Sequence, residues 1–310
     1  MSSATDSSLG KIRQIGGSGL SHPSATVAYV SVTPQRGLVR RPTTADVFTT
    51  HRYPPPPALA PWIAHFWTVT WDRGDAEPLE STVISFPAMH LTVEWGDPGA
   101  IRHGHPLPAT LVHGLISRVF RVQLSGRGGV VGVRFRADGF RAWSGVDADT
   151  LTDRVVPAAD VLSADLAGLH SGLGPDPEPE QVLHRLRLAL ERHRPATEPS
   201  GIGRVVDRMA SDPTLVRVDQ VAPAVGLSER TLQRRFRHEI GIGPKWVLSR
   251  FRLQEAALAL EQDPGVDLSA LAPRLGFYDQ AHLTNTFVEM LGETPAAYAA
   301  RASAGRQDGR

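Results

Sequence analysis

The chain has 310 residues, and its 33 Lys and Arg residues nearly balance its 32 Asp and Glu residues. This length predicts two domains, each with its own core. The lack of cysteine excludes a disulfide scaffold, thiolate catalysis and cysteine-ligated metal clusters. The Ser/Gly-rich start does not resemble a signal peptide, and no apolar run approaches the ~20 residues of a membrane span. We therefore expect a cytoplasmic protein without a membrane partner.

The first part of the chain changes character near residue 46. Residues 1–45 are rich in Ser, Thr, Gly and Pro, so we expect them to be disordered apart from one short strand at 26–32. Residues 46–173 contain short apolar runs between turn residues, which predicts a β-rich sensor or regulatory domain. The predicted strands are 63–71, 82–86, 90–95, 110–116, 118–124 and 130–135.

Residue alternation sets the class of this domain. Leu91, Val93 and Trp95 share one face of their strand, and His90, Thr92 and Glu94 share the other. A period of two with intervening turns predicts an antiparallel sheet, folded as a β sandwich or a barrel-like domain.

The remainder is predicted to be helical, which makes the fold class α+β multidomain. Residues 174–200 are predicted to be a linker that contains an amphipathic helix at 180–193. The apolar stripe of Val182, Leu186 and Leu190 either packs against a domain or forms a dimer helix. Residues 201–302 are expected to form an all-α domain, followed by a disordered tail at 303–310.

The helical part contains an internal repeat. Residues 221–227 align with 271–277 at an offset of 50 residues, which becomes 51 after the turn. In each copy a first helix ends at a glycine (Gly226, Gly276), and a cap residue (Ser228, Asp279) begins a second helix. The second helix buries an i, i+4 pair, Leu232 with Phe236 or Leu283 with Phe287. The pattern is typical of a double helix-turn-helix, and a helical hairpin without a ligand is the alternative. Pro223 and Pro273 predict first helices that are short, starting near residues 219 and 269, or that are kinked there.

These motifs resemble a known family. Leu-Gln-Arg-Arg-Phe (232–236), Leu-Gly-Phe (275–277) and Gly-Glu-Thr-Pro (292–295) are similar to the double helix-turn-helix, DNA-binding domain of AraC/XylS-type regulators, over residues 201–301. The resemblance implies double-stranded DNA as partner, read in two successive major grooves by helices that a linker helix at 244–261 holds apart. Residues 51–59, with Trp62 and Trp67, and 131–140 are similar to an uncharacterised β domain of one AraC-type subgroup.

The resemblance and the positions off the buried stripe indicate which residues contact DNA. Candidates for base reading are Arg230, Thr231, Gln233 and Arg234 in the first copy, and Gln280, Thr284 and Asn285 in the second. Candidates for phosphate contact are Ser228, Arg235, Arg237 and Lys245. Residues 230–252 contain seven basic residues and one acid, a net charge of +6, whereas residues 267–301 contain two basic residues and four acids, a net charge of −2. We expect the first copy to anchor the DNA and the second to tune sequence preference.

The β domain leaves two alternatives open. His103, His105 and His113, or His90 with Glu94, are spaced so that they could bind a metal, but we favour hydrogen-bonded or surface histidines and expect no metal and no cofactor. Trp62, Trp67, Trp71 and Trp95 are interpreted as core rather than as a ligand cage. The effector-binding residues are unknown at this point.

The predicted function is a sequence-specific transcription regulator of the activator type, without enzymatic activity, in which a small-molecule effector binds the β domain. RNA polymerase and a second copy of the chain, as a homodimer, are further candidate partners. The alternatives are a metal-dependent cupin-like enzyme with a helical appendage, and a protein-interaction module.

Overall fold

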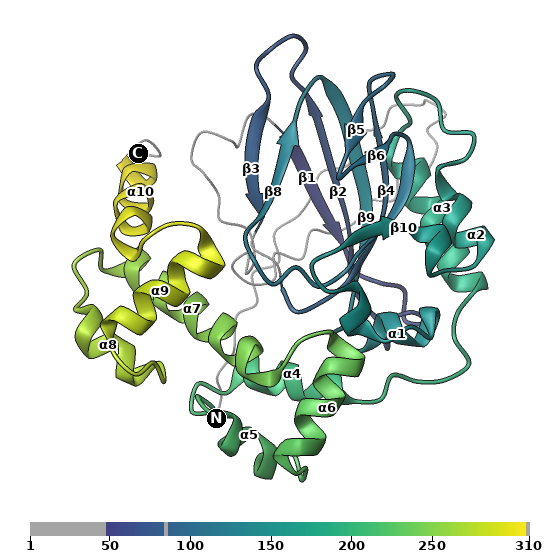
Figure 1. Ribbon diagram of the computed structural model, residues 1–310. Coiled ribbons are helices and arrows are strands. Elements are labelled where there is room, and N and C mark those ends of the chain that lie inside the picture. The colour runs from purple at the N-terminus through teal and green to yellow at the C-terminus, as the bar shows by residue number, and fades with distance from the viewer. Residues whose placement is uncertain (1–47, 84–85, 308–310) are drawn as a thin grey trace, which may run out of the picture. The chain divides into compact units, whose positions relative to one another are not determined.

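The computed structural model describes residues 48–83 and 86–307 (Figure 1). The predicted disorder of residues 1–45 and the predicted strand at 26–32 lie outside the described residues. Among those described, no helix has the length and apolarity needed to cross a membrane.

The N-terminal domain is built on a six-stranded antiparallel sheet with the order β1-β2-β9-β4-β7-β10. Its strands are β1 Phe48–Tyr53, β2 Ile63–Asp72, β4 His90–Gly96, β7 Ala109–His113, β9 Arg127–Phe135 and β10 Val155–Pro157. Two two-stranded sheets accompany it, β3 Leu79–Val83 with β8 Phe120–Leu124, and β5 Ile101–Arg102 with β6 His105–Pro106. The predicted antiparallel β domain is confirmed, although the strand expected at 82–86 lies earlier, at β3.

Alternation gives the large sheet two different faces. Leu91, Val93 and Trp95 of β4 and Val131 and Val133 of β9 are buried in one apolar core. The residues between them, including His90, Thr92, Glu94 and Arg134, line a cavity on the opposite face. Phe120 and Val122 of β8 line the same cavity, so the β3–β8 pair lies over this polar face.

Helices cover the apolar face. They are α1 Gly139–Ser144, α2 Ala164–Ala167 and α3 Pro179–Arg192, and 3₁₀ turns lie at Ala148–Leu151 (η2), Ala158–Asp160 (η3) and Gly168–His170 (η4). α3 packs on β2 and β9 and buries Val182, Leu186 and Leu190 in the same core as the strands. The sequence left open whether this stripe packs against a domain or forms a dimer helix. The structure shows packing against a domain, because the stripe faces the sheet.

The C-terminal helices repeat one arrangement. They are α4 Ile202–Ser211, α5 Val218–Ala224, α6 Glu229–Ile240, α7 Pro244–Gln262, α8 Leu268–Arg274, α9 Gln280–Leu291 and α10 Pro295–Gln307. Helices α5 and α8 are short and start near the predicted residues, with Pro223 and Pro273 next to their C-terminal ends. Gly226 (φ +68°) and Gly276 (φ +76°) adopt the left-handed backbone expected after them. α10 continues through 303–307, where a tail was expected, because its Ala-rich sequence favours helix.

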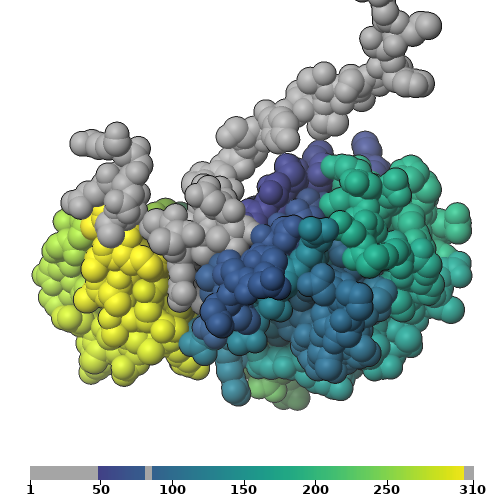
Figure 2. Space-filling view, turned by 90° about the horizontal axis from the view of Figure 1, so that it is seen from above, coloured from purple at the N-terminus to yellow at the C-terminus, as the bar shows by residue number. Residues whose placement is uncertain are grey.

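Helix α7 connects two separate cores. Val247, Leu248 and Phe251 pack into the core of α4, α5 and α6. Leu253, Ala256 and Leu260, further along, pack into the core of α8, α9 and α10. Since its two ends serve different cores, this helix is the linker predicted at 244–261. Figure 2 shows the close-packed exterior of the last helices, coloured yellow.

Candidate nucleic-acid interface and ligand cavity

The first candidate recognition helix is α6. The Ser228 hydroxyl accepts a hydrogen bond from the Thr231 backbone amide at 3.2 Å, as an N-cap does. Leu232 and Phe236 are fully buried, which fixes the rotation of the helix about its axis. Of the four base-reading candidates on α6, Arg230, Gln233 and Arg234 are exposed and Thr231 is half-buried.

The structure changes which cations of this region are available for DNA. Arg237 and Lys245 are exposed, as phosphate contacts require. Arg235, also a phosphate candidate, is half-buried; its Nε donates to Glu239 at 2.9 Å and its Nη2 to the carbonyl of Ser200 at 3.1 Å.

Two arginines counted in the local charge of +6 lie in the interior. Arg250 is 2% exposed and Arg252 is 1% exposed. Arg252 pairs with Glu255 and donates to the carbonyls of Asp212 and Leu215, so it holds the segment between α4 and α5. Of the seven basic residues at 230–252, four remain exposed, Arg230, Arg234, Arg237 and Lys245. The sequence charge therefore overstates the positive surface.

The second candidate recognition helix is α9. The carboxylate of Asp279 accepts a hydrogen bond from the His282 amide at 2.7 Å, which confirms the predicted cap. Gln280 and Asn285 are exposed, and Thr284 is half-buried.

Sequence reasoning missed one residue of this surface. Tyr278 is 88% exposed and directly precedes the cap of α9, where its hydroxyl can donate to a phosphate. An aromatic residue immediately before an N-cap was the signal that could have revealed it.

The β domain contains a cavity of about 230 Å³ between the polar face of the large sheet and β8. Trp67 and Trp71 line this cavity, whereas Trp62 and Trp95 lie in the apolar core. Trp62, Trp71 and Trp95 are buried, as the interpretation as core requires, whereas Trp67 is half-buried. Gly132 makes room for one, because a Cβ at this position would lie 2.4 Å from the Trp67 indole.

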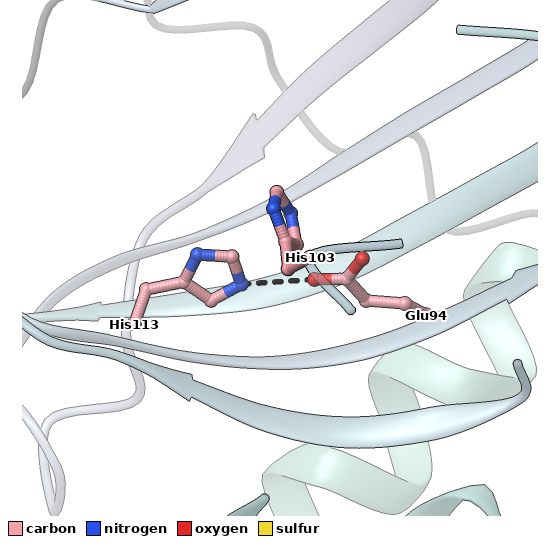
Figure 3. A group of neighbouring side chains, drawn as sticks. All are labelled: Glu94, His103 and His113. Carbon is pink, nitrogen blue, oxygen red and sulfur yellow. Dashed lines mark hydrogen bonds and ion pairs between the residues drawn. The ribbon is translucent and has the colours of Figure 1, made fainter. Parts of the chain in front are cut away.

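At one end of the cavity the structure brings together Glu94, His103 and His113 (Figure 3). His113 Nε2 donates to Glu94 Oε1 at 2.9 Å, and Arg102 Nη1 donates to Oε2 at 3.0 Å. Burial would raise the pKa of Glu94, but the His113 hydrogen bond and the Arg102 charge hold it well below its usual range. Burial and the charge of His113 lower the pKa of His103 to about 4. The carboxylate is therefore charged and already has protein partners.

The other metal candidates do not join this group. His105 Nε2 lies 3.3 Å from the carbonyl of Val155, and His90 Nδ1 accepts from Trp67 Nε1 at 3.2 Å. These contacts fit the favoured interpretation of hydrogen-bonded histidines, while the cluster of Glu94, His103 and His113 has the ligand types of a metal site.

Comparisons with known proteins agree with the division of the chain into a β domain and a helix-turn-helix domain. Residues 51–157 match a family model described as a domain of unknown function (DUF6597), and residues 221–301 match one described as a helix-turn-helix domain. Relatives that match by sequence are named as a putative AraC-like transcription regulator and as a helix-turn-helix-type transcriptional regulator. The C-terminal part is an AraC-type helix-turn-helix domain. In this AraC-type domain, α6 and α9 are the second helices of the two motifs.

An AraC-like transcription regulator of Streptomyces antibioticus is 30% identical over 125 residues, which are 38% of this chain and 41% of the relative. The regulator MtrA of Neisseria gonorrhoeae is 28% identical over 97 residues, 31% of each chain. The chain thus spans less than half the length of either. Among solved structures, ToxT from Vibrio cholerae is 8% identical with a TM-score of 0.38, covering 82% of this chain and 98% of ToxT.

Proposed function

We propose that this protein is a sequence-specific DNA-binding transcription regulator whose β domain binds a small effector. One observation carries the proposal: two helix-turn-helix units, each with its buried pair and cap, leave the opposite face of α6 and α9 exposed. An exposed helix face of this kind fits the major groove.

Direct readout is assigned to the exposed polar side chains of both helices. Arg230 and Arg234 can each donate two hydrogen bonds to a guanine, and Gln233 can pair with an adenine. On α9, Gln280 and Asn285 can read bases by the same amide geometry, with Thr284 beside them. Arg237, Lys245 and the hydroxyl of Ser228 are assigned to phosphates, and Arg235 joins them only after it leaves Glu239.

The test is binding of the full chain to a fragment from upstream of its own gene. We expect salt-dependent binding that is stronger than binding to random duplex of the same length. Arg234→Ala should weaken it by about 1–3 kcal/mol, the usual contribution of one bidentate base contact. Arg194→Ala, which removes the same charge from an exposed position before α4, is the matched control and should bind as the unchanged chain does. If no duplex binds at low salt, the proposal is wrong.

We extend the proposal to the partners that the family resemblance implies. The protein would contact RNA polymerase when it activates transcription, and it would form a homodimer. It would bind chromosomal DNA in the cytoplasm. In vitro transcription with and without the protein tests the first, and sedimentation of the full chain tests the second.

A metal-dependent enzyme is the second candidate, favoured by the cluster of Glu94, His103 and His113. Two imidazoles and one carboxylate can ligate iron, manganese or zinc. Metal analysis of the purified chain decides between the two. Stoichiometric metal that is lost in His103→Ala supports the enzyme, and a metal-free chain that binds DNA supports the regulator.

A further inference from the structure

The two ends of the cavity in the β domain differ in charge. Glu94 is the one carboxylate among the described residues that line it, and this carboxylate is bound by Arg102 and His113. His90 lies four residues earlier on the same strand, and His113 of β7 lies directly opposite it, so the His113 imidazole extends from beside His90 toward Glu94. The carboxylate of Glu94 is therefore already paired within the protein.

Cationic and imidazole groups meet at the end near His90. Strand register places Arg134 of β9 opposite His65 of β2 on one side and opposite His90 of β4 on the other. Since directly paired residues point to the same face, all three side chains line the cavity. Arg52 of β1 lies at the exposed rim of the same cavity.

One of these side chains, Arg134, has a buried donor without a hydrogen-bond partner in the described part of the protein. The buried Nε of Arg134 has no hydrogen-bond partner, and neither has the buried hydroxyl of Thr50, a lining residue that strand register places in the row of Glu94. The guanidinium of Arg134 lies 3.9 Å above the ring of Phe86, a contact through the face of the group that provides no acceptor for its Nε. Asp207 of α4 acts on Arg134 through its charge, but its ion-pair contact is with Arg136 at 3.6 Å.

The balance of charge at this end favours an anion. Burial, followed by the charge of Arg52, lowers the pKa of Arg134 to about 10, so the guanidinium keeps its charge near neutral pH. Burial, followed by the charges of Arg134 and Arg52, lowers the pKa of His65 to about 3, so this imidazole stays neutral and can accept or donate one hydrogen bond. A buried cation without a paired carboxylate is costly, and an incoming anion would remove that cost.

The rest of the wall is apolar. Trp67, Trp71, Phe120 and Val122 present rings and methyl groups to the cavity. A volume of about 230 Å³ lies below the roughly 300–1,000 Å³ of sites for drug-sized ligands. The occupant is therefore small, with one anionic group and an apolar body.

We propose that this cavity binds a small carboxylate with an aromatic or branched aliphatic body. Arg134 and Arg52 hold the carboxylate, for which the planar guanidinium is a bidentate partner, and the tryptophans and Phe120 enclose the body. The inference rests on the effector-binding part of the proposed function and names the class of that effector.

The test uses phenylacetate, 3-phenylpropionate and 4-phenylbutyrate as probes on the full chain. Binding is measured at millimolar concentration by calorimetry and by the tryptophan fluorescence of the chain, to which Trp67 and Trp71 of the cavity wall contribute. For each probe the neutral amide and the corresponding ammonium compound are the comparison ligands. We expect at least one carboxylate to bind and to raise the melting temperature, while its amide binds about tenfold more weakly, as the loss of a charged hydrogen bond predicts.

Substitutions of single arginines test where the carboxylate of the ligand binds. Arg134→Gln should remove the preference for carboxylate over amide. Arg52→Gln, at the exposed rim and so without a folding cost, should reduce the same preference. Arg121→Gln removes an exposed arginine of β8 and should leave the preference unchanged.

The outcomes separate this inference from the proposed function. A chain that binds DNA but none of the three carboxylates overturns the inference alone. Equal binding of carboxylate and amide, or an anion preference that survives in both Arg52→Gln and Arg134→Gln, overturns it as well. A chain that binds the carboxylate but no DNA overturns the proposed function and leaves the cavity assignment intact.

Discussion

The rings of Phe86 and Phe251 lie 5.4 Å apart, with an angle of 59° between their planes. Phe86 lines the cavity of the β domain and contacts the guanidinium of Arg134, whereas Phe251 belongs to helix α7 and to the core of the first helix-turn-helix. A ligand that moves Arg134 therefore acts on a ring that touches the linker helix.

Phe86→Leu tests this connection. The variant keeps an apolar side chain but loses both ring contacts, so we expect the effect of the carboxylate on DNA affinity to fall even at carboxylate concentrations that saturate the variant. Coupling between sites is typically about 1–3 kcal/mol, and it should approach zero here. The measurement is DNA affinity with and without saturating 3-phenylpropionate. Val122→Ala, another lining residue, should retain the coupling; full coupling in Phe86→Leu would contradict the connection.

Gly132→Val tests the packing that shapes the cavity. A Cβ at Gly132 would lie 2.4 Å from the Trp67 indole, so the indole must move. Overpacking of this kind costs about 1–3 kcal/mol, which should appear as a lower midpoint in urea and as altered tryptophan fluorescence. Gly74→Ala is the comparison, because a Cβ there meets nothing within 4 Å, although the φ of +50° adds backbone strain. Unchanged fluorescence in Gly132→Val would contradict the placement of Trp67.

The salt dependence of DNA binding distinguishes free from engaged arginines. Each phosphate contact contributes about 0.9 to the slope of log K against log salt concentration. Arg237→Ala and Lys245→Ala should each lower the slope by about this amount. Arg235→Ala should lower it less, because Glu239 and the Ser200 carbonyl hold its guanidinium. Equal effects from Arg235→Ala and Arg237→Ala would mean that Arg235 leaves Glu239 when DNA binds.

Acid should destabilise the β domain through its buried histidines. The pKa of His65 is about 3 and that of His103 about 4 in the folded chain, mainly because of burial, compared with about 6.5 when unfolded. Between pH 4 and 6.5 the unfolded chain binds more protons, so the free energy of unfolding falls as pH decreases through this window. Urea titrations at several pH values measure the slope, and His65→Gln should flatten it. A slope that stays the same in His65→Gln would show that this histidine is protonated in the folded chain.

Much of the architecture followed from local pattern. Alternation along 90–95 separated the core face of β4 from its cavity face, because side chains point to opposite sides at each successive residue. The repeated glycines and caps located both helix-turn-helix units, since left-handed backbone and N-caps have specific residue preferences. β1 was missed, because its short run leads directly into four consecutive prolines.

The candidate functional sites likewise combine features that the sequence predicts with features that only the tertiary structure shows. The exposed faces of α6 and α9 could be predicted, because the rotation of a helix follows from its buried i, i+4 pair. The contact of Arg235 with the Ser200 carbonyl and the burial of Arg250 and Arg252 could not, because these partners or surroundings come from other elements.

The nearly balanced charge of the chain illustrates the difference between what the sequence determines and what the tertiary structure determines. By itself the sequence determined an antiparallel β domain, a double helix-turn-helix and a basic first copy, all of which depend on residues close together in the chain. Only the tertiary structure decided which of those charges reach the surface, and that Arg134, His65 and His90 meet in one cavity. The reason is physical: these three residues lie on different strands, and strand register, which long-range packing sets, brings them side by side.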